Sequence, residues 1–196
     1  MKIYGNIETS TVDGPGRRAV IHLAGCSLGC DGCFSQHTHA TIGPNVTDVQ
    51  PEQLANHIAT LEIDGVTVSG GEPTDQIEEL AVFLQVLRLA GIDSIILYTG
   101  RRIEWLRKNT GGVWNLLETA QLVDIVVDGR YVKRLPENSW MRGSTNQQFI
   151  FLTERHILSD MQHHDTEVIV RGGEVLLMGF PSEEILSGFR DGNFDI

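Results

Sequence analysis

Short apolar runs alternate along the chain with segments of helical periodicity. Four of these runs have strand length and are rich in valine and isoleucine: residues 18–24 (RAVIHLA), 65–69 (GVTVS), 94–99 (SIILYT) and 122–127 (LVDIVV). Two apolar stripes with helical spacing lie between them: Leu54, Ile58 and Leu61 after Pro51, and Ile77, Leu80, Leu84 and Leu87 before Gly91. The alternation predicts a parallel sheet with right-handed crossover helices.

A glycine-marked polar turn follows each of the four predicted strands. The turns are GCSLGC (25–30), SGGEP (69–73), TG (99–100) and DG (128–129). Because parallel strands end at the same edge of a sheet, and ligands of such sheets bind at that edge, we expect all four turns to face one cavity.

The alternation is lost toward the C-terminus. Residues 145–153 (TNQQFIFLT) predict a further strand, and residues 166–180 predict a hairpin joined at Gly172–Gly173. We expect one compact unit, with a core domain over residues 1–150 and an extension over residues 151–196 packed on the same domain.

Composition and charge exclude several classes of partner. The chain has 196 residues and a formal net charge of -11 at pH 7, whereas nucleic-acid binding needs a clustered positive field. No apolar run reaches the length of about 18 residues that spans a bilayer, and the first residues lack the apolar core of a secretory signal. We therefore expect a cytoplasmic protein that binds neither nucleic acid nor a membrane.

All three cysteines of the chain, Cys26, Cys30 and Cys33, lie within eight positions. In a reducing compartment, thiols at this spacing indicate a metal or redox site rather than disulfides, and soft sulfur ligands select zinc, Cu(I) or iron–sulfur clusters. One alternative is a four-ligand zinc site completed by His37 or His39. The other is a 4Fe-4S cluster, which usually takes four cysteines, so that three would leave one iron open to a substrate or cofactor.

The cysteine spacing C-x3-C-x2-C, followed at once by Phe34, resembles the signature of radical S-adenosylmethionine (SAM) enzymes. The resemblance implies a 4Fe-4S cluster held by the three cysteines, whose open iron binds SAM and whose electron cleaves it to a 5'-deoxyadenosyl radical. The turn Gly70-Gly71-Glu72 is similar to the GGE motif of this family, which meets the methionine amino group of SAM. The resemblance also implies a partial (β/α) TIM-like barrel with a C-terminal extension.

Further sequence blocks resemble the activating enzymes of glycyl radical enzymes, especially the anaerobic ribonucleotide reductase activases. These blocks are VDGPGR (12–17), YTG (98–100), VDGRYV (127–132) and WMRGSTNQ (140–147), and the resemblance covers residues 4–150. It implies hydrogen abstraction from a glycine of a partner reductase and a flavodoxin- or ferredoxin-type electron donor. It also places Thr99 and Asp128 on the SAM carboxylate side, in some relatives through a monovalent cation. The chain departs from this pattern in Phe34-Ser35 and in the 46 residues that follow residue 150.

Several roles stay open at this stage. Asp128 is a SAM-side residue or an ordinary Asp-Gly turn. Arg142 and Asn146 face the target glycine or SAM, or they satisfy turn backbone groups. Asp13 and Arg17 anchor the cluster loop or form a turn with a surface charge.

The reaction also has alternatives. The enzyme would act on a different glycyl radical enzyme, on a peptide or on a pterin-like small molecule. A protein of another class would merely bind an iron–sulfur cluster or zinc without catalysis.

Overall fold

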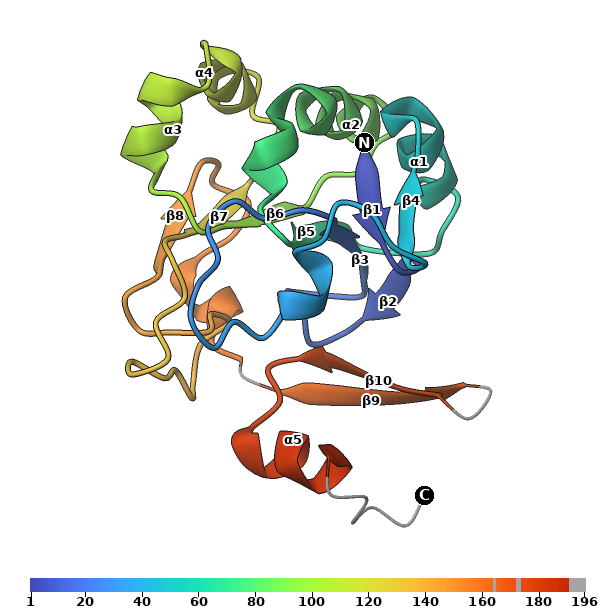
Figure 1. The fold of residues 1–196 in the computed structure, drawn as a ribbon. Coiled ribbons are helices and arrows are strands. Elements are labelled where there is room, and N and C mark those ends of the chain that lie inside the picture. The colour runs from blue at the N-terminus through green and yellow to red at the C-terminus, as the bar shows by residue number, and fades with distance from the viewer. Residues whose placement is uncertain (164, 172–173, 191–196) are drawn as a thin grey trace.

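The computed structural model describes residues 1–163, 165–171 and 174–190, and Figure 1 shows its fold. The predicted turn at Gly172–Gly173 lies outside the described residues. None of the helices in these ranges combines the length and apolar character needed to cross a bilayer.

The four predicted strands form the parallel centre of one sheet, which confirms that prediction. They are β3 (Arg18–Leu23), β5 (Gly65–Gly70), β6 (Ile95–Thr99) and β7 (Ile125–Asp128), and they lie side by side in that order. Their registers bring Leu23 beside Gly70 and Thr99 beside Asp128. The polar turns that follow these strands therefore begin at one edge of the sheet.

Antiparallel strands flank this parallel centre on both sides. They are β1 (Lys2–Tyr4), β2 (Glu8–Ser10), β4 (Val46–Asp48) and β8 (Gln148–Phe151). The strand predicted within residues 145–153 is thus confirmed as β8, which pairs with β7. Along the path β4-β1-β3-β5-β6-β7-β8 the described strands form an open sheet. The predicted α/β class is confirmed. The sheet of the described strands does not close into a TIM-like barrel, and the partial barrel stays a prediction.

Helices cover one face of the sheet, above the strands in Figure 1. They are α1 (Pro51–Ile58), α2 (Ile77–Leu89), α3 (Ile103–Asn109) and α4 (Val113–Thr119). The predicted stripe of α2 packs into the main core, whereas Leu61 lies beyond the end of α1. Within β6, Ile95 and Leu97 belong to this core and Ile96 to a second cluster with Met141 and Met161, as alternation along a strand requires.

Arg18, at the start of β3, is fully buried and ties this strand to β5 and to the residue before β6. Its guanidinium donates to Thr67 Oγ1 at 2.8 Å, to Ser94 Oγ at 2.9 Å and to the Val66 carbonyl at 2.7 Å. Burial lowers its pKa to about 10. Arg17 is exposed and its side chain donates only to Thr9 among the described residues, so the surface-charge interpretation of Arg17 fits and Arg18 is the structural anchor.

The C-terminal segment forms a separate layer on the side of the sheet opposite the main helices (Figure 1). A short 3-10 helix, Leu158–Met161, leads to the hairpin of β9 (Thr166–Arg171) and β10 (Glu174–Gly179), and α5 (Glu183–Arg190) follows. The predicted hairpin is therefore confirmed. β8 spans the predicted domain boundary at residue 150, and the division into core domain and extension stays a prediction.

Candidate functional site

A cavity of about 860 Å³ lies at the carboxyl ends of the four parallel strands. The turns after β3, β5, β6 and β7 all contribute to its wall, through Cys26, Glu72, Gly100 and Gly129 among others. The prediction that the four strand-end turns face one cavity is confirmed.

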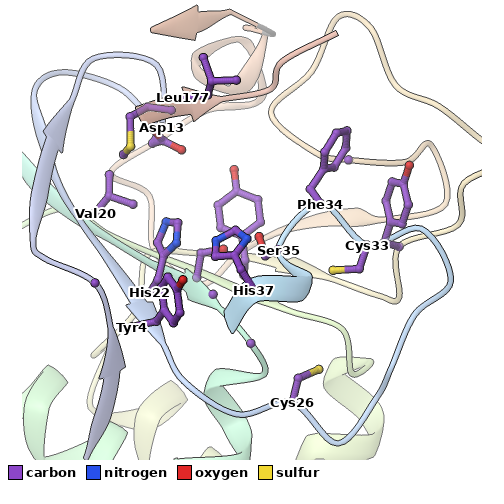
Figure 2. A pocket seen from close by; sticks show the side chains of 18 of the residues that line it. Tyr4, Asp13, Val20, His22, Cys26, Cys33, Phe34, Ser35, His37 and Leu177 are labelled. Atoms are coloured by element: carbon purple, nitrogen blue, oxygen red, sulfur yellow. The ribbon is translucent and has the colours of Figure 1, made fainter. Parts of the chain in front are cut away.

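The three cysteines line this cavity as free, half-buried thiols. Figure 2 shows Cys26 and Cys33 well separated along the loop that carries them. Burial is the main cause that raises the pKa of the Cys33 thiol. Among the described residues, no group of three or more His, Cys, Asp or Glu side chains is arranged to hold a single metal ion. Three soft donors spread over one wall of a cavity are a donor set that suits a cluster with several irons.

Polar contacts from other elements hold the cysteine loop in place. Asp75 accepts hydrogen bonds from the backbone N–H and the hydroxyl of Ser27, at 2.8 and 3.0 Å. Arg101 bridges the same two residues, and Arg130 donates to the Leu28 carbonyl. These anchors, which lie far from the loop in sequence, were not predicted, because a salt-bridging residue gives no periodic signal.

The glycines of the GGE turn are required by close backbone packing. A Cβ on Gly71 would lie 2.0 Å from the Gly25 carbonyl oxygen, and Gly70 has a φ of 107° with the Leu23 backbone 2.5 Å from its Cβ position. The N–H of Glu72 donates to the Gly25 carbonyl at 2.8 Å. The turn after β5 is thus joined directly to the beginning of the cysteine loop, and both line the cavity.

The carboxylate of Glu72 is buried and joins the ends of β5 and β6. Its Oε1 accepts from the backbone N–H and hydroxyl of Thr74 and from the Thr99 hydroxyl, at 2.6 to 3.0 Å. Its Oε2 accepts only the Gly100 N–H among the described residues, at 2.8 Å. A carboxylate oxygen can accept more than one hydrogen bond, so Oε2 keeps acceptor capacity on the cavity wall. Thr99 lines the same wall and positions Glu72.

Asp128 is buried, and its side chain is engaged on the helix side of the strand end. Its Oδ1 binds Arg102 at 2.6 Å, and its Oδ2 accepts the N–H of Ile103, the first residue of α3, at 2.9 Å. The cavity wall includes the neighbouring Gly129 and does not include Asp128. The structure therefore gives Asp128 a helix-start role, and its SAM-side role stays a prediction.

The block at residues 140–147 supports the end of β7. Arg142 binds Glu137 at 2.7 Å, which helps to lower the pKa of that carboxyl against its burial. Asn146 donates to the Arg130 carbonyl at 2.9 Å. The block reaches the cavity through Gly143 and Gln147 instead, and Gln147 donates to the Gly129 carbonyl. These contacts fit the interpretation in which Arg142 and Asn146 satisfy groups of the surrounding turns.

Aromatic and imidazole side chains line the cavity beside the cysteine loop. Tyr4 and His37 are in ring contact at 5.0 Å, and Figure 2 shows His22 beside them. Burial lowers the pKa of His22 to about 4 and also lowers the pKa of His37. Both rings are therefore neutral near pH 7. None of these three side chains was predicted to line the site, except that His37 was weighed as a zinc ligand.

The C-terminal hairpin supplies the wall of the cavity that faces the cysteine loop. Residues 175–181, Ile169 and Leu186 all line it. In Figure 2, Leu177 and Asp13 lie on one side of the pocket and Cys26 on the opposite side. Gly179 packs against Val12, and burial raises the pKa of the neighbouring Asp13 carboxyl. The block at residues 12–17 therefore meets the tail, a contact that the sequence did not reveal.

The comparison with protein families agrees with this site. Residues 12–150, more than half of the chain, match the model of the 4Fe-4S single cluster domain. The fold and the cysteine-lined cavity thus define an iron–sulfur domain, and the protein belongs to this 4Fe-4S family.

Several known proteins that are similar to this chain are activating proteins. The chain is 34% identical over 143 residues to the anaerobic ribonucleoside-triphosphate reductase-activating protein of Enterobacteria phage T4, covering 70% of this chain and 85% of the relative. It is 29% identical over 146 residues to the protein of the same name from Haemophilus influenzae, covering 71% and 90%. The pyruvate formate-lyase-activating enzyme of Listeria monocytogenes matches 97 residues at 35% identity, covering 46% and 39%. The predicted resemblance to activating proteins is confirmed.

Proposed function

We propose that this protein is a radical SAM activase that takes a hydrogen atom from a glycine of an anaerobic ribonucleotide reductase. The observation that carries the proposal is the meeting of three free cysteines and the Gly70-Gly71-Glu72 turn on one cavity wall. The relatives named as reductase-activating proteins support the choice of partner.

Cys26, Cys30 and Cys33 would hold a 4Fe-4S cluster, and SAM would occupy the adjoining space at the GGE turn. When bound, such a cluster would supply the electron for reductive cleavage of SAM, and SAM would supply the 5'-deoxyadenosyl group that takes the hydrogen atom from the glycine. Three thiolates leave one iron without a protein sulfur, which is the donor set that this chemistry needs.

The residues of this chain bind and orient SAM and shield the radical derived from it. Glu72 presents Oε2 on the cavity wall, where it suits an ammonium donor such as the methionine amino group of SAM. Thr99 fixes that carboxylate by its hydrogen bond to Oε1. The hairpin lines the cavity opposite the cysteine loop, and His22 adds a neutral ring to its wall. Both would limit the access of water to a reactive radical.

Finer assignments belong to the same proposal. The electron donor is a flavodoxin- or ferredoxin-type protein, and the location is cytoplasmic. Thr99 and Asp128 lie at adjacent strand ends, where a monovalent cation on the SAM carboxylate side would sit, although both side chains are engaged within the protein. Residues 1–150 form the core domain and residues 151–196 an extension packed on it.

The test is anaerobic reconstitution followed by chemical reduction. We expect about four irons per chain and formation of 5'-deoxyadenosine from SAM without any partner. A reconstituted sample that carries iron and leaves SAM intact would contradict the enzyme class. Electron paramagnetic resonance after mixing with an anaerobic ribonucleotide reductase then tests the partner, because a glycine-centred doublet is expected. A doublet only with a pyruvate formate-lyase would assign the partner of the Listeria relative instead.

A further inference from the structure

The strand β10 lines the cavity with consecutive residues. Successive side chains of a strand point to opposite faces, so a strand that met a cavity with one face would contribute alternate residues. Every residue from 175 to 179 lines this cavity, together with residues 180 and 181. β10 therefore presents an edge, with its backbone groups, to the cavity. Figure 1 agrees, because β10 lies between β9 and the body of the protein.

The register of the hairpin shows which backbone groups that edge carries. Phe180 donates its N–H to the carbonyl of Asp165, its antiparallel partner, at 2.9 Å. Hydrogen-bonded and non-hydrogen-bonded pairs alternate along an antiparallel ladder. The pairs Gly179–Thr166, Leu177–Val168 and Val175–Val170 are therefore non-hydrogen-bonded, and their backbone groups point away from the partner strand.

Gly179, at the end of this edge, lies beside the segment before β3, whose Asp13 also lines the cavity. A Cβ on Gly179 would be 2.7 Å from a methyl carbon of Val12 in that segment. The backbone groups of Leu177 and Val175 lie on the same edge, further along the strand. In the described part of the chain, β10 pairs only with β9, and the N–H groups of Leu177 and Val175 have no hydrogen-bond partner.

An edge of this kind is recognised by an extended polypeptide, which adds a strand and satisfies the open N–H and C=O groups. A small molecule such as SAM has no row of backbone groups to offer. The side chains that flank the edge, Leu176, Leu177 and Met178, are apolar. The cysteines lie across the same cavity, so a segment paired with this edge is carried past the cofactor wall.

We infer that the substrate protein presents its target glycine in an extended segment that pairs, as an added strand, with the free edge of β10. The inference rests on the proposed function, since it names how the partner of that reaction is held. The cysteine wall then serves the cofactors and the β10 edge serves the polypeptide.

Proline substitution on the two edges of the hairpin tests this inference. Leu177→Pro removes one N–H from the cavity edge of β10 and breaks no ladder hydrogen bond, a position where strands tolerate proline. Val168→Pro makes the same change on the outer edge of β9, opposite Leu177. Leu177→Ala removes the side chain and keeps the N–H.

With reconstituted enzyme, SAM and an anaerobic ribonucleotide reductase, we expect Leu177→Pro to lower kcat/KM for glycyl radical formation by at least about tenfold. In the same variant, partner-independent SAM cleavage is expected to fall far less than radical formation does. Val168→Pro and Leu177→Ala change radical formation by less than about threefold. Equal losses in the two proline variants would overturn the inference while leaving the activase function intact.

Amide hydrogen exchange on the wild-type holoenzyme gives a readout without substitutions. The amides of Val175 and Leu177 should exchange at least about tenfold more slowly once the reductase is added. Those of Leu176 and Met178 are protected beforehand by β9. If the reductase adds no protection, the inference is wrong. This exchange result does not depend on whether the protein cleaves SAM, so it is read separately from the test of the proposed function. Protection without the reductase also overturns it: concentration-dependent protection identifies a second copy on the edge, and concentration-independent protection identifies the chain's own terminal residues.

Discussion

The two walls of the cavity are held in place by different means. The strand-end wall is the part formed by the turns after β3, β5, β6 and β7. Hydrogen bonds between elements hold it together: Glu72 bonds to Gly25 and Gly100, and Ser27 bonds to Asp75. Among the described residues, the hairpin wall makes fewer polar contacts with the core: Glu167 accepts the N–H of Thr11 at 3.2 Å, and Gly179 packs against Val12. A wall fixed by many hydrogen bonds suits small cofactors, and a wall with open backbone groups suits a polypeptide.

The largest expected effect comes from the strand-end wall. Cys30→Ala removes one of three ligands, so we expect iron content to fall from about four per chain to near zero and SAM cleavage to vanish. Iron analysis and product chromatography measure both. The control is His39→Ala, which should keep both, because the cluster needs no histidine. Iron loss in the control together with bound zinc in the wild type would favour the zinc alternative.

The second test compares matched glycines on the two walls. A Cβ would meet backbone oxygen in both, 2.0 Å from Gly25 for Gly71 and 2.4 Å from Asp165 for Gly179. Gly71→Ala distorts the central sheet, so we expect it to lower the free energy of unfolding by about 3 kcal/mol. Gly179→Ala strains the hairpin and its contact with Val12, outside the central sheet, at about 1 kcal/mol.

Denaturant unfolding measures both losses. Gly43→Ala is the control, since it has no neighbour within 4 Å of its Cβ position. Equal losses for Gly71→Ala and Gly179→Ala would mean that the hairpin is as integral to the fold as the sheet, and the contrast between the walls would be wrong.

The strand-end wall was predictable from sequence because its signals are local. Buried parallel strands are continuous apolar runs, and the glycines and cysteines that follow them stand next to those runs. The short strands β1, β2 and β4, with three residues each, are too brief for a detectable period.

The contacts that complete the site are long-range and left no such signal. Arg18 begins an apolar run, where its burial is set by Thr67 of β5 and by Ser94, the residue before β6. The hairpin could be predicted from its sequence pattern, but its position depends on contacts such as that of Gly179 with Val12. Two roles stayed open for Asp128, because a strand-end position alone does not say which side of the strand a carboxylate serves.

A third test weakens one anchor of the cysteine loop. Asp75→Ala removes both hydrogen bonds to Ser27 and the ion pair with Arg101. We expect the cluster to remain and the rate of SAM cleavage to fall about tenfold, because the loop no longer holds the thiolates in one geometry. Asp93→Ala, which loses only an exposed ion pair with Arg155, should leave the rate unchanged. An unchanged rate in Asp75→Ala would show that the cluster alone orders the loop.

The smallest expected effect concerns pH. Burial keeps the folded pKa of His22 at about 4, below its unfolded value of about 6.5. The unfolded chain therefore binds more protons than the folded one between these values, and the stability contributed by neutral His22 is complete above pH 6.5 and lost as pH falls toward 4. Unfolding measured from pH 7.5 to 5.5 should show this loss in the wild type and a flatter profile in His22→Gln. Parallel profiles would mean that His22 stays solvated.

Isotope transfer is the most direct test of the reaction itself. An anaerobic ribonucleotide reductase with deuterium on the α-carbon of its target glycine is mixed with the reduced, reconstituted protein and SAM. We expect each 5'-deoxyadenosine formed with a glycyl radical to carry one deuterium, which mass spectrometry detects. Unlabelled 5'-deoxyadenosine beside a full glycyl radical signal would contradict direct abstraction by the radical made in this cavity.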